Sequence, residues 1–187
     1  MKYDPQKHHR RSIRLKGYDY TQAGAYFITI CVHNRECLFG EIIDGEMRLN
    51  EYGQIVAEEW AKSSEIRKEI EMDEWVVMPN HIHGIVVIAD SVGAHGVGAH
   101  GRAPLRAAHL QRQPRSLGSF VAGSKSATTK RINMMRGTQG APVWQDNYYE
   151  HIVRNENDLN RIREYIINNP ARWDADQENP SNVNKAK

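Results

Sequence analysis

Long apolar runs are missing from this chain, and cysteine is scarce. No stretch of its 187 residues approaches the ~20 consecutive apolar residues that a membrane-spanning helix needs. The N-terminus, MKYDPQKHHRRSIRLKG, lacks the apolar core of a secretory signal. Two cysteines, Cys31 and Cys37, are too few for a disulfide scaffold, and we interpret them as reduced core residues. We therefore expect a cytoplasmic protein with no membrane partner.

Acidic residues are absent from positions 91–145, and the charges of the whole chain are unevenly distributed. Residues 1–17 carry six lysines and arginines against one aspartate, whereas acids concentrate between Glu51 and Glu74. This separation favours a basic face for a polyanion with the acidic face turned away from it, although ordinary solvated surface is the alternative. The candidate contacts to a polyanion are Arg10, Arg11, Arg14, Lys16, Lys125, Lys130 and Arg131.

The length of the chain fits one domain with tails. We expect a basic arm at 1–17, the domain at 18–172 and a polar, frayed tail at 173–187. Within the domain, residues 90–115 contain the pentapeptide VGAHG twice in tandem and are rich in Gly and Ala. Such a segment has little to bury, which predicts a flexible insertion. No defined geometry would hold its histidines, so we interpret them as linker residues and not as metal ligands.

Short runs of β-branched and aromatic residues alternate with helical patterns along the domain. Asn50 and Asn155 precede two of the helical patterns as candidate N-caps. The resulting order predicts an α+β sandwich, with a mainly antiparallel sheet and helices on one or both faces. We expect strands at 26–33, 37–43, 74–78, 81–89 and near 149–152, with the first two forming a hairpin, and helices at 51–63, 117–135 and 156–168.

The stretch WVVMPNHIHGIVVI, residues 75–88, carries the strongest chemical signal. Side chains alternate between the faces of a strand, so His81 and His83 project from one face and Ile82 from the other. Two imidazoles one pleat apart can bind a single divalent ion. A pair of surface histidines on a half-buried strand is the alternative, because an isolated His-x-His motif is a weak signal.

The last predicted helix carries Tyr165 and Asn169, which lie four residues apart and hence on one face. The phenol is a candidate nucleophile, and the amide oxygen is a candidate third metal ligand. The alternative is structural: a tyrosine at the edge of the core, and an asparagine that caps the helix before Pro170.

Taken together, these pieces resemble the single-tyrosine HUH transposases, and most closely the REP-associated tyrosine transposases. The resemblance covers residues 18–172 apart from the insertion. Its most specific motifs are MPNHIHGI, the block WQDNYYEHIVR and the helix end YIINNP.

The resemblance implies a ferredoxin-like fold and a single-stranded DNA transposase that cleaves and rejoins strands at hairpin DNA through a 5′-phosphotyrosine. It implies Mg²⁺ or Mn²⁺ held by His81, His83 and Asn169, with Tyr165 as nucleophile. Tyr148 and Tyr149 are the nearest rivals, and we assign them to packing or DNA contact. It also implies a nucleoid-associated protein, either a monomer or a homodimer, with the tyrosine acting in cis or in trans. For stacking on unpaired bases, Tyr18, Tyr20 and Tyr26 are candidates because they lie near the basic arm, although core packing is favoured for Tyr26.

Three other functions are alternatives to the one that this resemblance implies. A histidine-triad nucleotide hydrolase would need a histidine where the chain has Ile85. A cupin-like oxygenase would need further ligands on later strands and little helix. A DNA-hairpin-binding regulator that has lost cleavage is the serious alternative, although the presence of His81, His83, Tyr165 and Asn169 argues against it.

Overall fold

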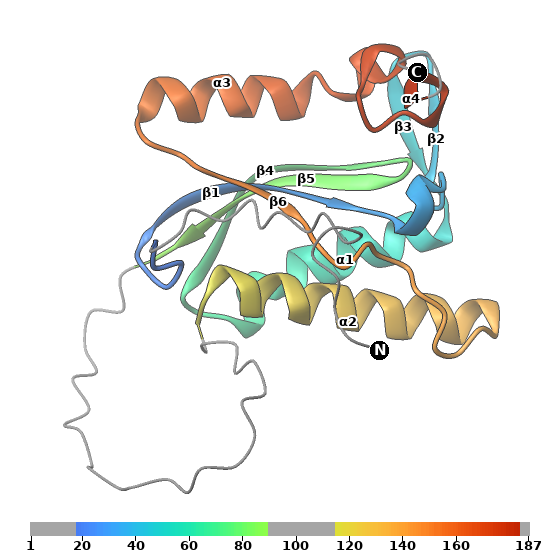
Figure 1. Cartoon of the computed structure of the whole chain (residues 1–187), viewed down its shortest axis with the longest axis horizontal. Helices are drawn as coiled ribbons and strands as arrows, with labels where there is room; N and C mark the ends of the chain where they lie inside the picture. Colours follow the sequence, from blue (N-terminus) through green and yellow to red (C-terminus); the bar gives the residue numbers. More distant parts are fainter. Residues whose placement is uncertain (1–17, 90–114, 184–187) are drawn as a thin grey trace, which may run out of the picture.

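The computed structural model describes residues 18–89 and 115–183, and these form three layers (Figure 1). The middle layer is a four-stranded sheet in the order β4-β5-β1-β6, and every neighbouring pair is antiparallel. With the helices between its strands, this is the arrangement of a ferredoxin-like sandwich, so the predicted fold class is confirmed. The predicted arm at 1–17 and residues 90–114 of the predicted insertion lie outside the described residues. The strands are β1 Gly24–Cys31, β4 Ile70–Met78, β5 His81–Ile88 and β6 Tyr149–Ile152.

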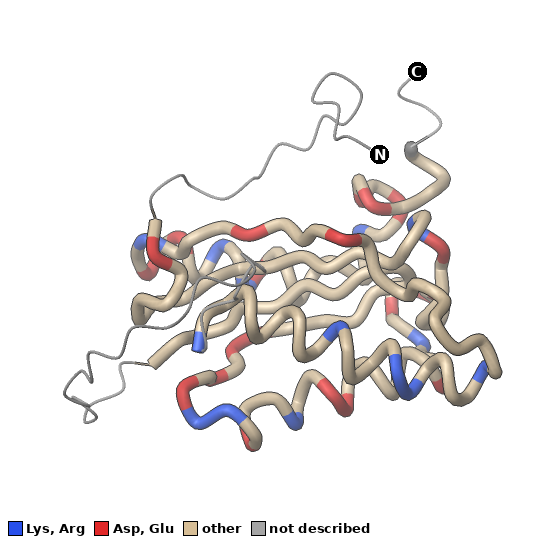
Figure 2. The backbone as a smooth tube through the Cα atoms, turned by 60° about the horizontal axis from the view of Figure 1, so that its bottom comes forward, with Lys and Arg blue, Asp and Glu red and all other residues tan. Residues whose placement is uncertain are grey.

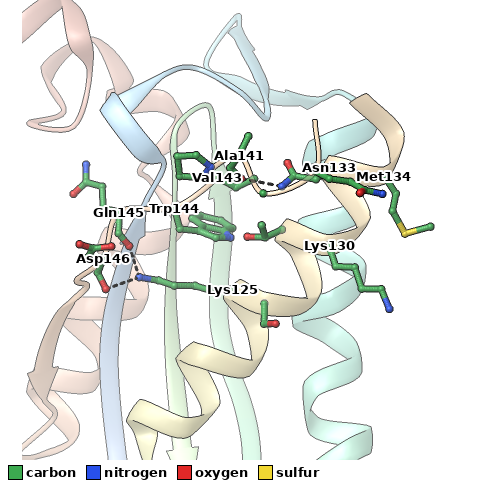
Figure 3. Close-up of a pocket in the computed structure, with 14 residues that line it drawn as sticks. Lys125, Lys130, Asn133, Met134, Ala141, Val143, Trp144, Gln145 and Asp146 are labelled. Carbon is green, nitrogen blue, oxygen red and sulfur yellow. Dashed lines mark hydrogen bonds between the residues drawn. The ribbon is translucent and has the colours of Figure 1, made fainter. Parts of the chain in front are cut away.

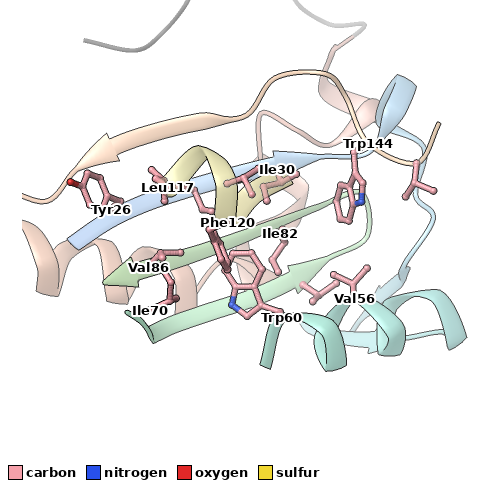
Figure 4. Packing of buried hydrophobic residues seen from close by; sticks show 14 of the residues in the cluster. Tyr26, Ile30, Val56, Trp60, Ile70, Ile82, Val86, Leu117, Phe120 and Trp144 are labelled. Carbon is pink, nitrogen blue, oxygen red and sulfur yellow. The ribbon is translucent and has the colours of Figure 1, made fainter. Parts of the chain in front are cut away.

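Helices cover both faces of this sheet. α1 (Glu51–Ile66) and α2 (Leu117–Arg136) lie on one face, and α3 (Glu156–Ile167) lies on the other (Figure 1). The main core fills the space between the sheet and the α1–α2 layer, where Trp60 and Phe120 meet edge to face with ring centroids 5.3 Å apart (Figure 4). A smaller apolar cluster lies under α3 and consists of Phe27, Ile85, Ile162 and Ile166.

The helix ends follow the sequence closely. The side chain of Asn50 accepts hydrogen bonds from the backbone N–H groups of Tyr52 and Gly53, and that of Asn155 accepts one from Asp158. Both predicted N-caps are therefore confirmed. At the C-terminal end of α2, the capping residue Gly137 has a left-handed φ of 66°, a conformation that glycine adopts without steric cost.

The predicted hairpin between the first two strands is wrong. β2 (Gly40–Ile43) pairs with β3 (Glu46–Leu49) in a separate two-stranded sheet. Both edges of β1 are already occupied, one by β5 and the other by β6. The chain leaves β1 through the short 3₁₀ turn His33–Arg35, in which Asn34 and Arg35 have positive φ. This turn redirects the backbone, and the local strand pattern did not reveal it.

An ion pair fixes α3 against the sheet. The pairing of β4 with β5 slips between Met72 and Trp75, and Asp73 lies in this irregular stretch. Arg163 of α3 donates two hydrogen bonds to the Asp73 carboxylate, at 2.8 Å and 2.5 Å. Hydrogen bonding to Arg163 lowers the pKa of Asp73, which keeps this carboxylate charged. This ion pair fixes the position of the C-terminal part of α3 on the sheet.

Gly84, directly after the two histidines, is required by close packing. A Cβ atom at this position would lie 2.5 Å from Cζ2 of the buried Trp60. We expect Gly84→Ala to lower the free energy of unfolding by about 1–3 kcal/mol, the usual cost of overpacking a core. Urea denaturation measures this change. As a control, Gly123→Ala on α2 adds a Cβ whose nearest neighbour is a guanidinium nitrogen of Arg67 at 3.9 Å, an ordinary contact, and should stabilise the protein slightly. Equal stability of Gly84→Ala and the parent would contradict the argument.

Candidate functional site

His81 and His83 lie on the face of β5 that is turned toward α3, as the strand period predicts. Both side chains are buried, and their Nε2 atoms are 3.0 Å apart. Two nitrogens that each bind one ion at about 2.1 Å, at right angles, would be about 3.0 Å apart. The pair is therefore spaced like two adjacent ligands of a single divalent ion.

The orientation of His81 is set by Asn80. The Asn80 amide nitrogen donates to the backbone oxygens of Arg35 (3.0 Å) and Glu178 (2.7 Å). Its Oδ1 must therefore be the atom that faces Nδ1 of His81 at 2.8 Å, and Nδ1 donates the proton. The lone pair of His81 is thereby placed on Nε2, the atom that faces His83. Sequence reasoning treated Asn80 only as part of a turn and missed this role.

His83 is held by a threonine on the neighbouring strand. Its Nδ1 lies 2.8 Å from Oγ1 of Thr29, the residue paired with it across β1 and β5. Burial lowers the pKa of His83 well below its ordinary value, and the nearby His81 lowers it further. Burial also lowers the pKa of His81 to about 4, although the Asp176 carboxylate opposes this effect. Both imidazoles are therefore neutral at neutral pH, as metal ligands must be.

Tyr165 lies at the edge of α3, directly above the histidines. Its Oη is 3.3 Å from Nε2 of His83, and its ring is edge to face with Phe27, with centroids 5.9 Å apart. Burial raises the pKa of this phenol to about 12, and the charge of Asp176 adds to the effect. The side chain is nevertheless 41% exposed, so a ligand in the neighbouring cavity can reach the hydroxyl.

Asn169 is buried beside the same two residues. Its side chain influences the pKa of both His81 and Tyr165. The amide nitrogen donates to Asp176 at 3.0 Å, whereas Oδ1 has no hydrogen-bond partner among the described residues. It does not cap α3, because the residue at that C-cap is Asn168. A buried amide oxygen without a partner suits a metal ligand.

The segment after α3 corrects the expectation of a frayed tail. It forms the 3₁₀ helix η2 (Pro170–Ala175) and the short helix α4 (Pro180–Val183), and Trp173 of η2 lies against His81 with ring centroids 6.0 Å apart. Arg35 anchors it through an ion pair with Glu178, at 3.2 Å. Asp176 is buried there, and together with His81 and His83 it offers ligand atoms that all lie within 4.8 Å of one another. The polar composition of this segment did not indicate that it packs, because the packing depends on contacts with residues about 100 positions away in the chain.

A cavity of about 540 Å³ opens over this cluster. Its walls include His83, Tyr165, Asn169 and Asp176, and it also exposes both tyrosines that sequence reasoning named as rivals, Tyr148 and Tyr149. Arg172, which follows α3, lines it as well and was not singled out from the sequence. The structure thus brings the four predicted site residues together and adds Asp176 and Arg172.

The predicted polyanion contacts are placed unevenly. Arg10, Arg11, Arg14 and Lys16 lie outside the described residues. Arg131 bonds Glu58 and Glu59 of α1, both at 2.7 Å. Acidic and basic residues are interspersed along the helical layer (Figure 2), so within the described residues the acidic α1 is not turned away from the basic α2. The helical period of α2 alone could not show that acidic α1 packs beside it.

Lys125 and Lys130 border a second hollow of about 720 Å³, between α2 and the loop that follows it (Figure 3). Lys130 is exposed. The ammonium of Lys125 instead donates to the backbone oxygens of Gln145 (2.7 Å), Asp146 (3.4 Å) and Asn147 (2.9 Å). Gln145 lines this hollow and the cavity over the histidines, so the two hollows meet at that residue.

One comparison with known proteins decides the family. The chain is 43% identical over 178 residues to a protein of Haemophilus influenzae, strain KW20/Rd, whose function is uncharacterized. The match covers 94% of this chain and 96% of that protein. This chain belongs to the family of the H. influenzae protein. No family model matches the chain.

Solved structures add information on the fold of this H. influenzae protein family. The chain is similar to a REP-associated tyrosine transposase bound to a REP hairpin, with a TM-score of 0.56 and 19% identity. The similarity covers 86% of this chain and 74% of that chain, and it shows a shared fold. For a protein from Deinococcus radiodurans that is proposed to be a transposase, the TM-score is 0.39 and the identity is 16%. That similarity covers 83% of this chain and 95% of the other, and we base no argument on it.

One further finding bears on the predicted absence of a membrane partner. Among the residues described for this family member, no helix combines the length and the apolar character needed to cross a bilayer.

Asp176 gives a sharp test of whether this cluster binds a metal ion. We expect Asp176→Asn to weaken Mn²⁺ binding by about 10-fold or more, because hard divalent ions prefer a charged carboxylate to an amide. Isothermal titration calorimetry measures the affinity. The control is Asp174→Asn, which neutralises an exposed acid in the same segment. Unchanged affinity in Asp176→Asn, or an equal loss in the control, would remove Asp176 from the ligand set.

Proposed function

We propose that this protein is a metal-dependent enzyme that cleaves and rejoins single-stranded DNA at hairpins, with Tyr165 as nucleophile. One observation carries the proposal: the Tyr165 hydroxyl lies 3.3 Å from Nε2 of His83, which in turn contacts His81. Tyr165, His83 and Asn169 line one cavity, and the fully buried imidazole of His81 lies directly behind His83. These are the groups that a single-tyrosine HUH transposase requires.

The fold supports this proposal by analogy. The similar solved structure is a tyrosine transposase bound to a REP hairpin. Because one fold can host many functions, this similarity supports the ligand class but not the chemistry. The chemistry is argued from the site alone.

The residues present fit a divalent ion. His81 and His83 supply two nitrogens at a suitable separation, and Asp176 and Asn169 supply oxygens. A set of two nitrogens and two oxygens suits Mn²⁺ well, and suits Mg²⁺ less well because Mg²⁺ prefers oxygen ligands. When bound, such an ion withdraws charge from a phosphate oxygen and makes the phosphorus more electrophilic.

The residues of the chain then position and carry out the transfer. The oxygen of Tyr165 forms a bond to phosphorus, and the bond from phosphorus to the 3′ oxygen breaks. The phenol proton is released, and the leaving oxygen takes up a proton as a 3′-hydroxyl. The resulting 5′-phosphotyrosine keeps the energy of the ester, so a second 3′-hydroxyl can reverse the step and join strands without ATP. Arg172, at the wall of the same cavity, can stabilise the phosphate charge.

A DNA-hairpin-binding regulator without cleavage is the second proposal. Lys130 borders the hollow beside α2, and the basic residues of the predicted arm would serve phosphate binding without any chemistry at Tyr165. The two functions differ in whether a covalent product forms.

A cleavage assay separates these functions. Labelled hairpin oligonucleotides from the DNA that flanks the gene, with single-stranded extensions, are incubated with the protein and Mn²⁺ or Mg²⁺. A denaturant-stable protein–DNA adduct that EDTA abolishes would support the enzyme. Tight, salt-dependent binding of the hairpin with no adduct in either metal would favour the regulator.

A further inference from the structure

Tyr149 presents an aromatic ring beside the proposed nucleophile. The ring is 44% exposed and lines the cavity over the histidines. The tyrosines first considered for base stacking are placed differently. Tyr20 and Tyr26 are buried in the main core, and Tyr18 packs against it. Tyr149 therefore offers an accessible aromatic surface that those three side chains do not.

The sheet register places Tyr149 in line with the metal-binding residues. Tyr149 of β6 pairs with Thr29 of β1, which pairs with His83 of β5. Directly paired residues project their side chains from the same face, so these three residues form a row across the sheet. Tyr149 lies two strands from His83, a separation of about 10 Å. This is a suitable distance for a base whose own phosphate lies near the histidines.

Phe27 supports both tyrosines from below. Its ring meets Tyr149 edge to face at 6.2 Å and Tyr165 edge to face at 5.9 Å. It also stacks on His83 at 5.4 Å. Phe27 is buried, so its position is fixed by the sheet and the cluster under α3. The two phenol rings therefore rest on one rigid support.

We propose that Tyr149 is a substrate-binding residue, on whose exposed ring an unpaired base next to the scissile phosphate stacks. The inference rests on the proposed function and names one part of its substrate: a flipped or single-stranded nucleobase. The cavity of about 540 Å³ falls within the roughly 300–1,000 Å³ typical of sites for small organic groups. An aromatic side chain can stack on any of the bases, so this site would bind the strand without selecting its sequence.

The experiment combines protein variants with modified DNA. Hairpin oligonucleotides carry 2-aminopurine, a fluorescent base quenched by stacking, at each single-stranded position in turn. We expect quenching at one position, and loss of that quenching in Tyr149→Leu together with about 5- to 150-fold weaker binding. Tyr149→Phe keeps the ring and should behave like the parent protein. Tyr149→Trp should also retain quenching, which provides a second variant if Tyr149→Leu folds poorly.

An abasic nucleotide makes the test specific. If the base at the quenched position stacks on Tyr149, removing that base and removing the ring should not weaken binding additively. Additive losses, or a 2-aminopurine profile in Tyr149→Leu identical to that of the parent, would overturn the inference.

Adduct formation, followed in parallel, separates this inference from the proposed function. If adducts form and neither quenching nor binding depends on Tyr149, the proposed enzyme is supported and the stacking site is refuted. If quenching depends on the Tyr149 ring and no adduct forms, the stacking site is supported and the proposed nuclease is refuted. With neither quenching nor adducts, both would fall.

Discussion

Replacing Tyr165 by phenylalanine is expected to abolish the covalent protein–DNA adduct. The substitution removes one oxygen and leaves the ring between Phe27 and His83, so the fold and the cavity are kept. Among the described residues, the other hydroxyl that contacts the histidine pair is that of Thr29, and it faces Nδ1 of His83. No nucleophile would therefore remain in place. We expect no adduct above background on a denaturing gel, whereas hairpin binding should change less than about threefold.

Two matched variants control this result. Tyr148→Phe and Tyr149→Phe remove the hydroxyls of the other tyrosines that line the cavity, and both should still form the adduct. Tyr165 contacts His83 of its own chain. A mixture of Tyr165→Phe with His83→Ala should therefore remain inactive. An adduct in Tyr165→Phe would transfer the role to another tyrosine, and activity of the mixture would show that the tyrosine acts in trans.

The second large effect is expected from His83→Ala. Loss of this imidazole removes one of two adjacent nitrogen ligands and should weaken Mn²⁺ binding by more than the roughly 10- to 100-fold that loss of an outer hydrogen-bond partner causes. Cleavage should fall below detection at micromolar metal. Calorimetry with Mn²⁺ measures the affinity, and the hairpin assay measures cleavage over a metal titration.

Thr29→Val and His33→Ala calibrate that loss. Thr29→Val keeps both imidazoles but removes the hydroxyl that lies 2.8 Å from Nδ1 of His83, so an intermediate loss of about 10- to 100-fold is expected. His33 lines a neighbouring surface hollow that contains none of the candidate ligands, and His33→Ala should bind metal like the parent. Metal affinity in His83→Ala equal to that of the parent would exclude the histidine pair as a metal site.

Much of the fold could be predicted because its signals are local. Alternation along residues 81–88 placed His81 and His83 on one face, and the structure has them there. Asn50 and Asn155 cap helices where their side-chain chemistry indicated. Each of these features depends on residues within one or two turns of helix or one strand, so the pattern carries the information.

Contacts between distant segments were predicted less well. The partner of β1 was misassigned because pairing depends on which edge is free, and residues 33–35 turn the chain away. Arg131 was assigned to a polyanion, yet it bonds two glutamates of α1. Charge counted along the chain does not show which charges become neighbours.

By itself, the sequence determined the strand with its two histidines, the helix with Tyr165, and the α+β class, because periodicity and capping act over a few residues. Asn169, which was expected on that helix, lies just after its C-cap. Only the tertiary structure decided that Asp176 joins the histidines, that Arg172 and Tyr149 face the same cavity, and that Asn80 sets the proton on His81. Asp176 lies far from the histidines in the chain, and Asn80, although adjacent to His81, is oriented by the distant Arg35 and Glu178. These contacts form only when the sheet, α3 and the segment after it pack together and bury polar groups that must then find partners.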